Sequence, residues 1–200
     1  MTGFDAVILA NGLFPTAAEP LQLLREARYV VCCDGAACHW PQCDAIVGDG
    51  DSVPEELRTR LIQIDEQEDN DLTKATRYCL SKGMRRIAYL GATGRREDHT
   101  LGNISLMVRY AREMGVEPLM VTDDGWFVVA KGEESFESFA GQQVSIFNVD
   151  CKRLSSEGLK WASYPYGQLW QGTLNEAQGS AFKLTGDGYY LVYRTYFAKV

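Results

Sequence analysis

The chain has 200 residues, 46% of them hydrophobic, and a formal net charge of −7. Those values describe an ordinary globular protein, and the acidic balance argues against a nucleic-acid partner, because phosphate backbones are bound by clustered lysines and arginines. The sequence contains no apolar run of transmembrane length and no basic segment before the short apolar stretch at its N-terminus. We therefore expect a cytoplasmic protein that does not engage a membrane.

The first half of the chain alternates short apolar segments with helical ones. Strands are predicted over DAVILA, YVVCC, AIVGD, LIQID, RIAYLG and EPLMVTD, and helices over EPLQLLREA, SVPEELRTRL, DLTKATRYCLSKG and DHTLGNISLMVRYAREMG. Ser52 with Glu55 three residues later forms a capping-box pattern, and Gly83 and Gly115 are typical helix ends. Strands that alternate with helices pair in parallel, so we expect residues 1–123 to form an α/β domain with a mostly parallel, Rossmann-like sheet.

The pattern changes near Asp123. The segments GWFVVAKG, QQVSIFNV, GSAFKLTG and GYYLVYRTYF alternate in polarity or are rich in β-branched and aromatic residues, and glycines separate them. No helical periodicity is left in this half. We expect residues 124–200 to form an all-β sandwich.

Four of the six cysteines, Cys32, Cys33, Cys38 and Cys43, crowd around His39. This crowding suggests a zinc site, but the chain contains no C-x-x-C pair and its other potential ligands are scattered. We expect reduced thiols instead.

Acidic or Gly-Arg segments follow four predicted strands. YVVCC precedes Asp34 and Gly35, AIVG precedes Asp49 and Asp51, LIQID precedes a segment that ends in Asp71, and RIAYL precedes Gly91, Gly94, Arg95, Arg96, Asp98 and His99. Each feature has a local explanation, since acids stabilise helix starts and Asp-Gly pairs favour turns. Ligands of open parallel sheets bind beyond the carboxyl ends of the strands, however, so four such loops favour one shared site.

Charge predicts what this site binds. Asp49 and Asp51 flank one residue, and with Asp71 they would repel one another unless a divalent cation lay between them. Mg²⁺ prefers such oxygen ligands. The glycines would let backbone N–H groups approach the oxygens of a phosphate ligand, and Arg95 and Arg96 would neutralise the remaining negative charge of that phosphate. No Walker A loop occurs.

Three motifs in the first half of the chain and two in the second resemble the signatures of the thiamine pyrophosphokinases. GDGDS, EQEDNDLTKA and GATGRREDHTLGNI resemble G-D-x-D-S, D-Q-x-x-T-D-x-x-K-A and G-G-x-x-x-R-x-D-H-x-x-x-N, in this order. In the second half, EGLKW and GTLNE resemble G-L-K-W and S-x-S-N-E. The resemblance extends from ILANG to GYYLVY.

The resemblance implies an α/β domain followed by a β-sandwich that binds thiamine and forms a homodimer. It implies transfer of the pyrophosphoryl group of ATP to thiamine, which yields thiamine diphosphate and AMP, with Mg²⁺ as cofactor. We expect active sites shared between the two subunits, with Trp161 of one subunit serving the carboxylates of the other.

The motifs also imply roles for individual residues. Asp49, Asp51 and Asp71 resemble the magnesium ligands and, with Arg96 and Asp98, the catalytic groups. The residues expected to bind ATP are Asp34, Gly35, Gln67, Lys74, Gly91, Gly94, Arg95 and His99, and those expected to bind thiamine are Trp161, Thr173 and Asn175. The attacking hydroxyl would be oriented by Asp98 or Asp71. Trp161 could instead be a core aromatic residue of the sandwich.

This chain departs from the signatures at several positions. Glu66 replaces an aspartate, Asn70 a threonine, Arg95 a frequent glycine and Leu174 a serine. Two other functions remain open: a different magnesium-dependent phosphotransferase or nucleotide hydrolase, and a non-catalytic vitamin or nucleotide sensor.

Overall fold

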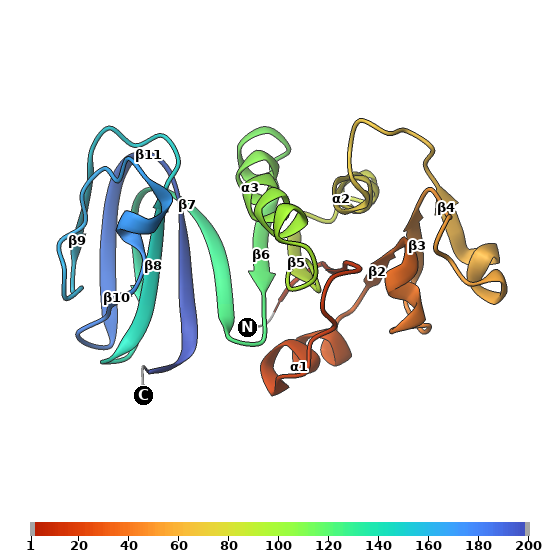
Figure 1. Ribbon diagram of the computed structural model, residues 1–200, viewed down its shortest axis with the longest axis horizontal. Coiled ribbons are helices and arrows are strands. Elements are labelled where there is room, and N and C mark those ends of the chain that lie inside the picture. The colour runs from red at the N-terminus through yellow and green to blue at the C-terminus, as the bar shows by residue number, and fades with distance from the viewer. Residues whose placement is uncertain (1–2, 199–200) are drawn as a thin grey trace. The chain divides into compact units, whose positions relative to one another are not determined.

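The computed structural model describes residues 3–198. Contacts divide the chain into two compact units, Met1–Asp123 and Asp124–Val200 (Figure 1). The division falls where the sequence pattern changes from alternating strands and helices to strands alone. Each unit is described by itself below.

The N-terminal unit contains a parallel sheet. Its strands are β1 (Ala6–Leu9), β2 (Val30–Cys33), β3 (Ala45–Gly48), β4 (Leu61–Gln63), β5 (Arg86–Leu90) and β6 (Glu117–Val121). Within this unit they lie in the order β6-β5-β1-β2-β3-β4, and each adjacent pair is parallel. The order changes direction between β1 and β5, which makes this pair the topological switch point of the sheet.

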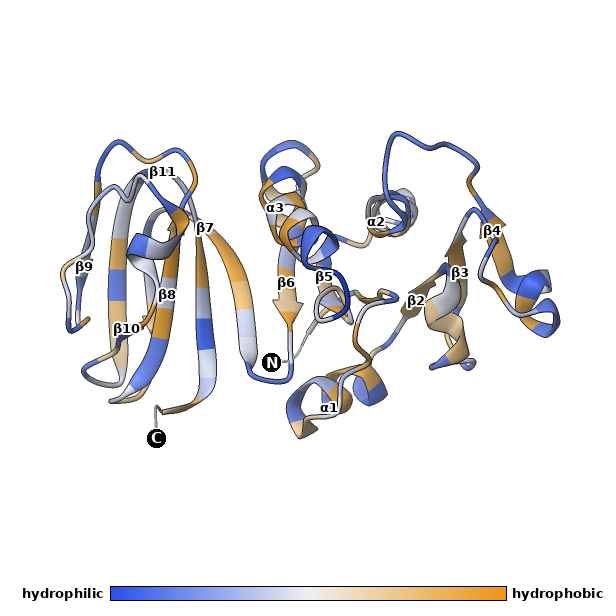
Figure 2. Ribbon diagram, in the orientation of Figure 1, coloured by the Kyte–Doolittle hydropathy of each residue, from blue (hydrophilic) through white to orange (hydrophobic). Residues whose placement is uncertain are grey.

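Helices cover both faces of this sheet. Figure 1 shows α2 (Asp71–Ser81) and α3 (Glu97–Glu113) on one face and α1 (Ala18–Glu26) on the other. The sheet is therefore buried on both sides, and this explains why β1, β2 and β3 consist entirely of buried residues. Figure 2 shows the contrast between the hydrophobic β3 and the hydrophilic loop that joins β4 to α2.

The C-terminal unit is antiparallel. Its strands are β7 (Gly125–Glu137), β8 (Gln142–Asn148), β9 (Leu154–Glu157), β10 (Asn175–Glu176) and β11 (Ala181–Ala198). Strand β11 pairs with β7 along both of its halves, with β9 through residues 183–186 and with β8 through residues 190–198. The two long strands therefore contribute to both layers of a sandwich, whose core includes Phe136, Ile146 and Tyr190. The expected fold class, an α/β unit followed by an all-β unit, is confirmed.

Two local expectations were wrong. Segment 52–61 forms the 3₁₀ helix η2 (Glu55–Arg60) without a side-chain cap, because the Ser52 hydroxyl donates to Asp51 Oδ1 (2.9 Å) and its N–H to Asp34 Oδ2 (3.0 Å). The last two predicted strands are one strand, β11, whose register shifts between Thr185 and Tyr189. Short 3₁₀ helices also occur at η1 (Asp34–Cys38) and η3 (Leu169–Gly172).

Among the described residues, no helix combines the length and the apolar character that crossing a membrane requires.

Candidate active site

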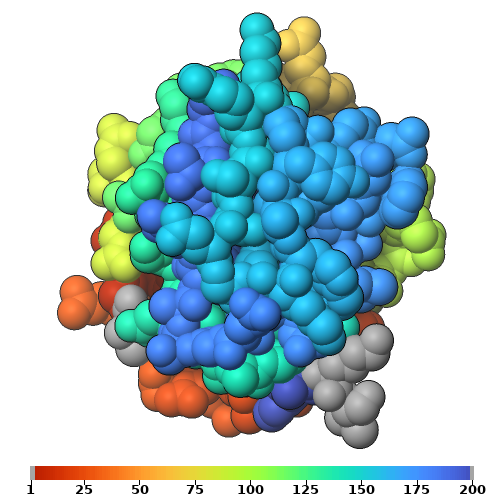
Figure 3. All heavy atoms as spheres, turned by 90° about the vertical axis from the view of Figure 1, so that its left-hand side faces the viewer, coloured from red at the N-terminus to blue at the C-terminus, as the bar shows by residue number. Residues whose placement is uncertain are grey.

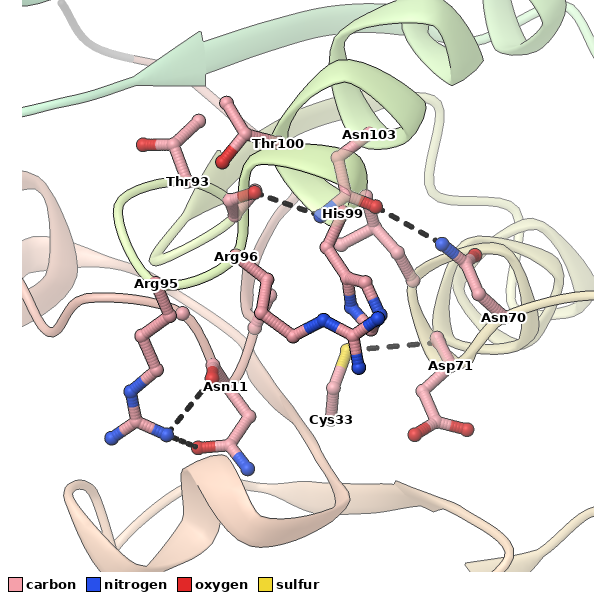
Figure 4. Close-up of a pocket in the computed structure, with 14 residues that line it drawn as sticks. Asn11, Cys33, Asn70, Asp71, Thr93, Arg95, Arg96, His99, Thr100 and Asn103 are labelled. Atoms are coloured by element: carbon pink, nitrogen blue, oxygen red, sulfur yellow. Dashed lines mark hydrogen bonds between the residues drawn. The ribbon is translucent and has the colours of Figure 1, made fainter.

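A cavity of about 360 Å³ lies at the switch point of the parallel sheet. Residues that follow β1 and β5 line it, together with the last residue of β2, the start of α2 and the first two turns of α3 (Figure 4). Its lining consists of Ala10, Asn11, Gly12, Cys33, Asn70, Asp71, Leu72, Ala92, Thr93, Arg95, Arg96, His99, Thr100 and Asn103. The position agrees with the rule that ligands of such sheets bind beyond the strand ends, where the order reverses.

Backbone hydrogen bonds join the loops that follow β1 and β5. Ala10 N donates to Leu90 O (2.8 Å), Gly12 N to Gly91 O (2.6 Å) and Leu13 N to Thr93 O (2.8 Å). Gly91 has a φ of 61°, and a Cβ at this position would lie 2.5 Å from Ala10 O. Only glycine allows so close an approach.

Two arginines of the loop after β5 border the cavity. Arg95 Nη1 donates to the backbone oxygen and to Oδ1 of Asn11, both at 3.2 Å. Arg96 precedes α3 and forms a two-point ion pair with Asp98, through Nε–Oδ1 (3.1 Å) and Nη2–Oδ2 (2.6 Å). Arg96 thereby lowers the pKa of Asp98 below its ordinary value of 3.8. Figure 4 shows Arg95 beside Asn11, whereas His99 and Asp71 approach the cavity from α3 and α2.

Three carboxylates gather beside this cavity. Oxygen atoms of Asp34, Asp49 and Asp51 lie within 4.8 Å of one another. Asp34 is only 4% exposed, and its two oxygens accept N–H groups of Gly50 (3.1 Å) and Ser52 (3.0 Å) from the loop that carries the other two acids. Burial raises the pKa of Asp34, and the charges of Asp71 and Asp51 add to the rise. These hard oxygen donors suit Mg²⁺.

Asp71 is not one of the three clustered acids, although it faces them. It lines the cavity at the start of α2 and pairs with the buried Lys74 through Oδ1 and Nζ (3.4 Å). Burial raises the pKa of Asp71, Lys74 opposes the rise, and Asp49 and Asp51 contribute to it. The predicted metal ligands were Asp49, Asp51 and Asp71. In the structure, Asp34 joins Asp49 and Asp51, and Asp71 lies at the border of this group.

The other expected residues divide into several groups. Gly91 and Gly94 shape the loop after β5 through positive φ angles, and Gly35 lies against Asn11, since a Cβ on Gly35 would lie 2.7 Å from Asn11 Nδ2. Gln67 is exposed in the loop before α2, where its amide donates to Asp65 O (3.2 Å), and it does not line the cavity.

Asn11, Asn70 and Asn103 line the cavity but were not among the expected site residues. Asn11 stands two residues after β1, where no acidic or arginine side chain marks the strand end as part of the site. Asn103 was visible only as the last letter of a motif.

The residues expected to bind thiamine lie in the C-terminal unit. Trp161 is 54% exposed, and the Asn175 side chain holds its backbone by accepting from Trp161 N (3.2 Å) and donating to Trp161 O (2.8 Å). Thr173 follows η3 and donates its hydroxyl to Trp170 O (2.7 Å). Trp161 is thus presented on the surface and is not a core residue of the sandwich.

A doubly wound α/β unit with carboxylates and arginines at its switch point has the features of a phosphate-handling protein. Two family models match this chain: "Thiamin pyrophosphokinase, catalytic domain" over residues 21–117 and "Thiamin pyrophosphokinase, substrate-binding domain" over residues 125–193. The chain belongs to the thiamin pyrophosphokinase family, which confirms the resemblance of its motifs.

Known relatives support this assignment. Thiamin pyrophosphokinase 1 of Caenorhabditis elegans is 28% identical over 126 residues, which represent 54% of this chain and 50% of the relative. The match therefore spans half the length of that protein. The crystal structure of thiamine pyrophosphokinase from Bacillus subtilis superimposes with a TM-score of 0.75 at 20% identity and covers 98% of this chain and 99% of its own. The yeast enzyme gives a TM-score of 0.77 at 15% identity, covering 98% and 88%. At these identities the structures establish the fold.

Proposed function

We propose that this protein is a thiamine diphosphokinase, which transfers the pyrophosphoryl group of ATP to the hydroxyl group of thiamine and releases AMP. The observation that supports this most directly is the arrangement of one cavity, two arginines and a carboxylate cluster in a chain that both family models match. No observation on the described residues favours the other phosphotransferase, the hydrolase or the sensor.

In this proposal the cavity holds the polyphosphate. Arg95, Arg96 and His99 line it and would neutralise phosphate oxygens, while the loop with Gly91 and Gly94 brings backbone groups close. Such a transfer depends on alignment and charge neutralisation. Asp71, which lines the cavity, would orient the attacking hydroxyl, because Asp98 is engaged by Arg96 and lies outside the lining.

We propose that Asp49 and Asp51 are the main ligands of Mg²⁺, with Asp71 at the border of the site. Asp34 would support them by holding their loop through Gly50 and Ser52. A bound Mg²⁺ would supply positive charge that orients the phosphates and draws electron density from the reacting phosphorus.

Thiamine would be recognised by the C-terminal unit. The exposed ring of Trp161 offers a flat face to the aromatic and cationic rings of thiamine. Asn175 would act by holding Trp161 in place, because its side-chain oxygen and nitrogen both bond the Trp161 backbone. Thr173 would contact the substrate from the neighbouring turn.

We further propose a homodimer formed through the C-terminal unit. Figure 3 shows that the segment between β9 and β10 spreads across one face of this unit. Leu169, Trp170 and Leu174 of that segment are 65%, 69% and 63% exposed, which is unusual for a monomer surface. A second copy of the chain would cover them. The proposed location is the cytoplasm, where ATP is present and the six free cysteines would stay reduced.

Incubation with ATP, Mg²⁺ and thiamine tests the activity. The expected products are thiamine diphosphate and AMP in equal amounts. Formation of ADP with thiamine monophosphate would show an ordinary kinase, and release of free phosphate without thiamine modification would show a hydrolase. ATP binding without any turnover would support the sensor.

A further inference from the structure

Two side-chain amides join the acidic side of the cavity to its arginine-bearing side. Asn70 Nδ2 donates to Asn103 Oδ1 (3.0 Å), and Asn103 Nδ2 donates to the backbone oxygen of Ala92 (2.7 Å) (Figure 4). Asn70 immediately precedes Asp71, and Ala92 lies in the loop that carries Arg95 and Arg96. We call the pair Asn70 and Asn103 the amide bridge.

The surroundings fix the orientation of both amides. Asn70 Oδ1 accepts from the N–H and the hydroxyl of Thr73, both at 3.0 Å, so its nitrogen faces Asn103. The Thr73 hydroxyl also bonds the Tyr110 hydroxyl (2.8 Å), and Thr73 is fully buried. Asn103 is 9% exposed, and its nitrogen must face the Ala92 carbonyl because its oxygen already accepts from Asn70. Such buried polar networks hold one geometry when every member has a partner.

A third contact holds the acidic end of the bridge. The Cys33 thiol at the end of β2 donates to the backbone oxygen of Asp71 (3.6 Å). The start of α2 is therefore attached to both β2 and α3. The position of Asp71 relative to Arg95 and Arg96 then depends on contacts that do not involve any of these three side chains.

Asparagine is required at position 70 for both of its contacts. A threonine, which the family signature has here, ends one bond closer to the backbone. Its hydroxyl could cap α2 through the Thr73 N–H, as threonine does at many helix starts, but it would not reach Asn103 as a donor. The bridge is thus a feature of this chain's own residues.

We propose that Asn70 and Asn103 are positioning residues, which fix the spacing between Asp71 and the loop of residues 91–96 before the nucleotide binds. This inference rests on the proposed function, because the spacing matters for a polyphosphate held between the two sides. Preorganised groups lose less freedom when the ligand binds, so the bridge increases affinity for ATP and aligns the reacting groups.

The test compares Asn70→Thr and Asn103→Ala with Ser105→Ala, a control on the same helix, α3. Asn70→Thr retains the helix cap but breaks the bridge. We expect kcat/KM for ATP to fall about tenfold in each bridge variant, the effect of losing one ordinary hydrogen bond. The KM for thiamine should stay near the wild-type value, because the thiamine contacts are intact. The melting temperature of Asn70→Thr should fall only slightly, because the cap is retained and one hydrogen bond is lost.

The double variant gives a second criterion. Both substitutions break the same bridge. The decrease in kcat/KM for ATP in the double variant, which carries Asn70→Thr and Asn103→Ala, should therefore be no larger than the greater of the two single decreases. Independent losses that multiply would contradict a shared role. A purely structural role would lower the melting temperature without the selective effect on ATP.

Hydrogen exchange in the protein without ligands separates this inference from the proposed function. We expect faster amide exchange in residues 91–96 of Asn70→Thr and unchanged exchange in β3. Unchanged exchange in that loop, together with unchanged affinity for ATP and Mg²⁺ measured by calorimetry without thiamine, would overturn the inference. Absence of AMP formation by the wild-type protein would overturn the proposed function and leave the exchange result to decide on the bridge.

Discussion

At the scale of single residues, the acid cluster combines two unfavourable features. Asp34, Asp49 and Asp51 place like charges within 4.8 Å of one another, and Asp34 is buried as well. Asp34 also has a φ of 39°, in the left-handed region that non-glycine residues rarely adopt. Strained backbone and crowded like charges persist where other interactions hold them, and they concentrate at functional sites.

Replacement of Asp51 by asparagine tests the proposed ligand role. We expect turnover at saturating Mg²⁺ to fall at least about a hundredfold, since a ligand contributes more than the groups around it. The melting temperature without metal should stay the same or rise, because repulsion within the cluster decreases. Added Mg²⁺ should raise the melting temperature of the wild-type protein but not that of Asp51→Asn. Glu68→Gln, an exposed change outside the cluster, is the control, and near-normal turnover of Asp51→Asn would disprove the assignment.

Asp5 provides a prediction about pH that is independent of the site. Its Oδ2 accepts the N–H groups of Arg86 (2.9 Å) and Arg85 (2.8 Å), and these two bonds lower the pKa of Asp5 below 3.8. A depressed pKa in the folded protein stabilises the fold above the unfolded-state value, and this contribution is lost as the pH falls through the folded-state value. The stability difference between wild type and Asp5→Asn should therefore shrink between about pH 5 and pH 2. Parallel thermal unfolding of both proteins measures it, and a constant difference would refute the expectation.

At the scale of elements, the site depends on the contact between the loops after β1 and β5. Gly12 lies in this contact, and a Cβ there would collide with the backbone oxygens of Gly91 and Thr93. The loops would have to separate to accommodate it. Gly102 differs, because a Cβ at that position on α3 would meet nothing within 4 Å apart from its chain neighbours and the adjacent helix backbone.

These two glycines should respond in opposite ways to alanine. Gly12→Ala should lower the free energy of unfolding by about 1–3 kcal/mol, as overpacking does, and should raise the KM for ATP. Gly102→Ala should raise the free energy of unfolding by up to about 1 kcal/mol, because alanine favours helices more than glycine does. Urea denaturation gives both values. Equal effects of the two substitutions would show that the loop contact is not tightly packed.

At the scale of the whole molecule, the chain presents a polar cavity in one unit and an exposed tryptophan in the other. The polar cavity with its arginines suits a polyphosphate, and the exposed tryptophan ring suits an aromatic cation. The proposed C-terminal dimer would follow twofold symmetry and create two equivalent sites. Each would use carboxylates from one protomer and Trp161 from its partner.

Mixing two inactive variants tests this sharing. Asp51→Asn lacks the metal ligand, and Trp161→Ala lacks the thiamine platform. If sites are shared, a mixed dimer contains one site with both groups intact, so activity should reappear after subunit exchange and approach about half of the wild-type value per mixed dimer. Mass measurement confirms the exchange. Exchange without recovery of activity would place the complete site within one chain.

The sequence determined the classes of structure and the chemistry of the loops. Buried parallel strands read as short apolar runs, and acids or glycines directly behind them marked the site, because both signals depend on neighbours in the chain. Asp49, Asp51, Arg95 and Arg96 could therefore be predicted as site residues from the sequence alone.

Only the tertiary structure decided which loops meet. The strand order places β1 beside β5, and this brings Asn11 to Arg95. The expected capping box failed for the same kind of reason, since Asp34, which is distant in the sequence, takes the N–H of Ser52. A hydrogen bond between side chains that are far apart along the chain leaves no periodic pattern, so the fold alone determines it.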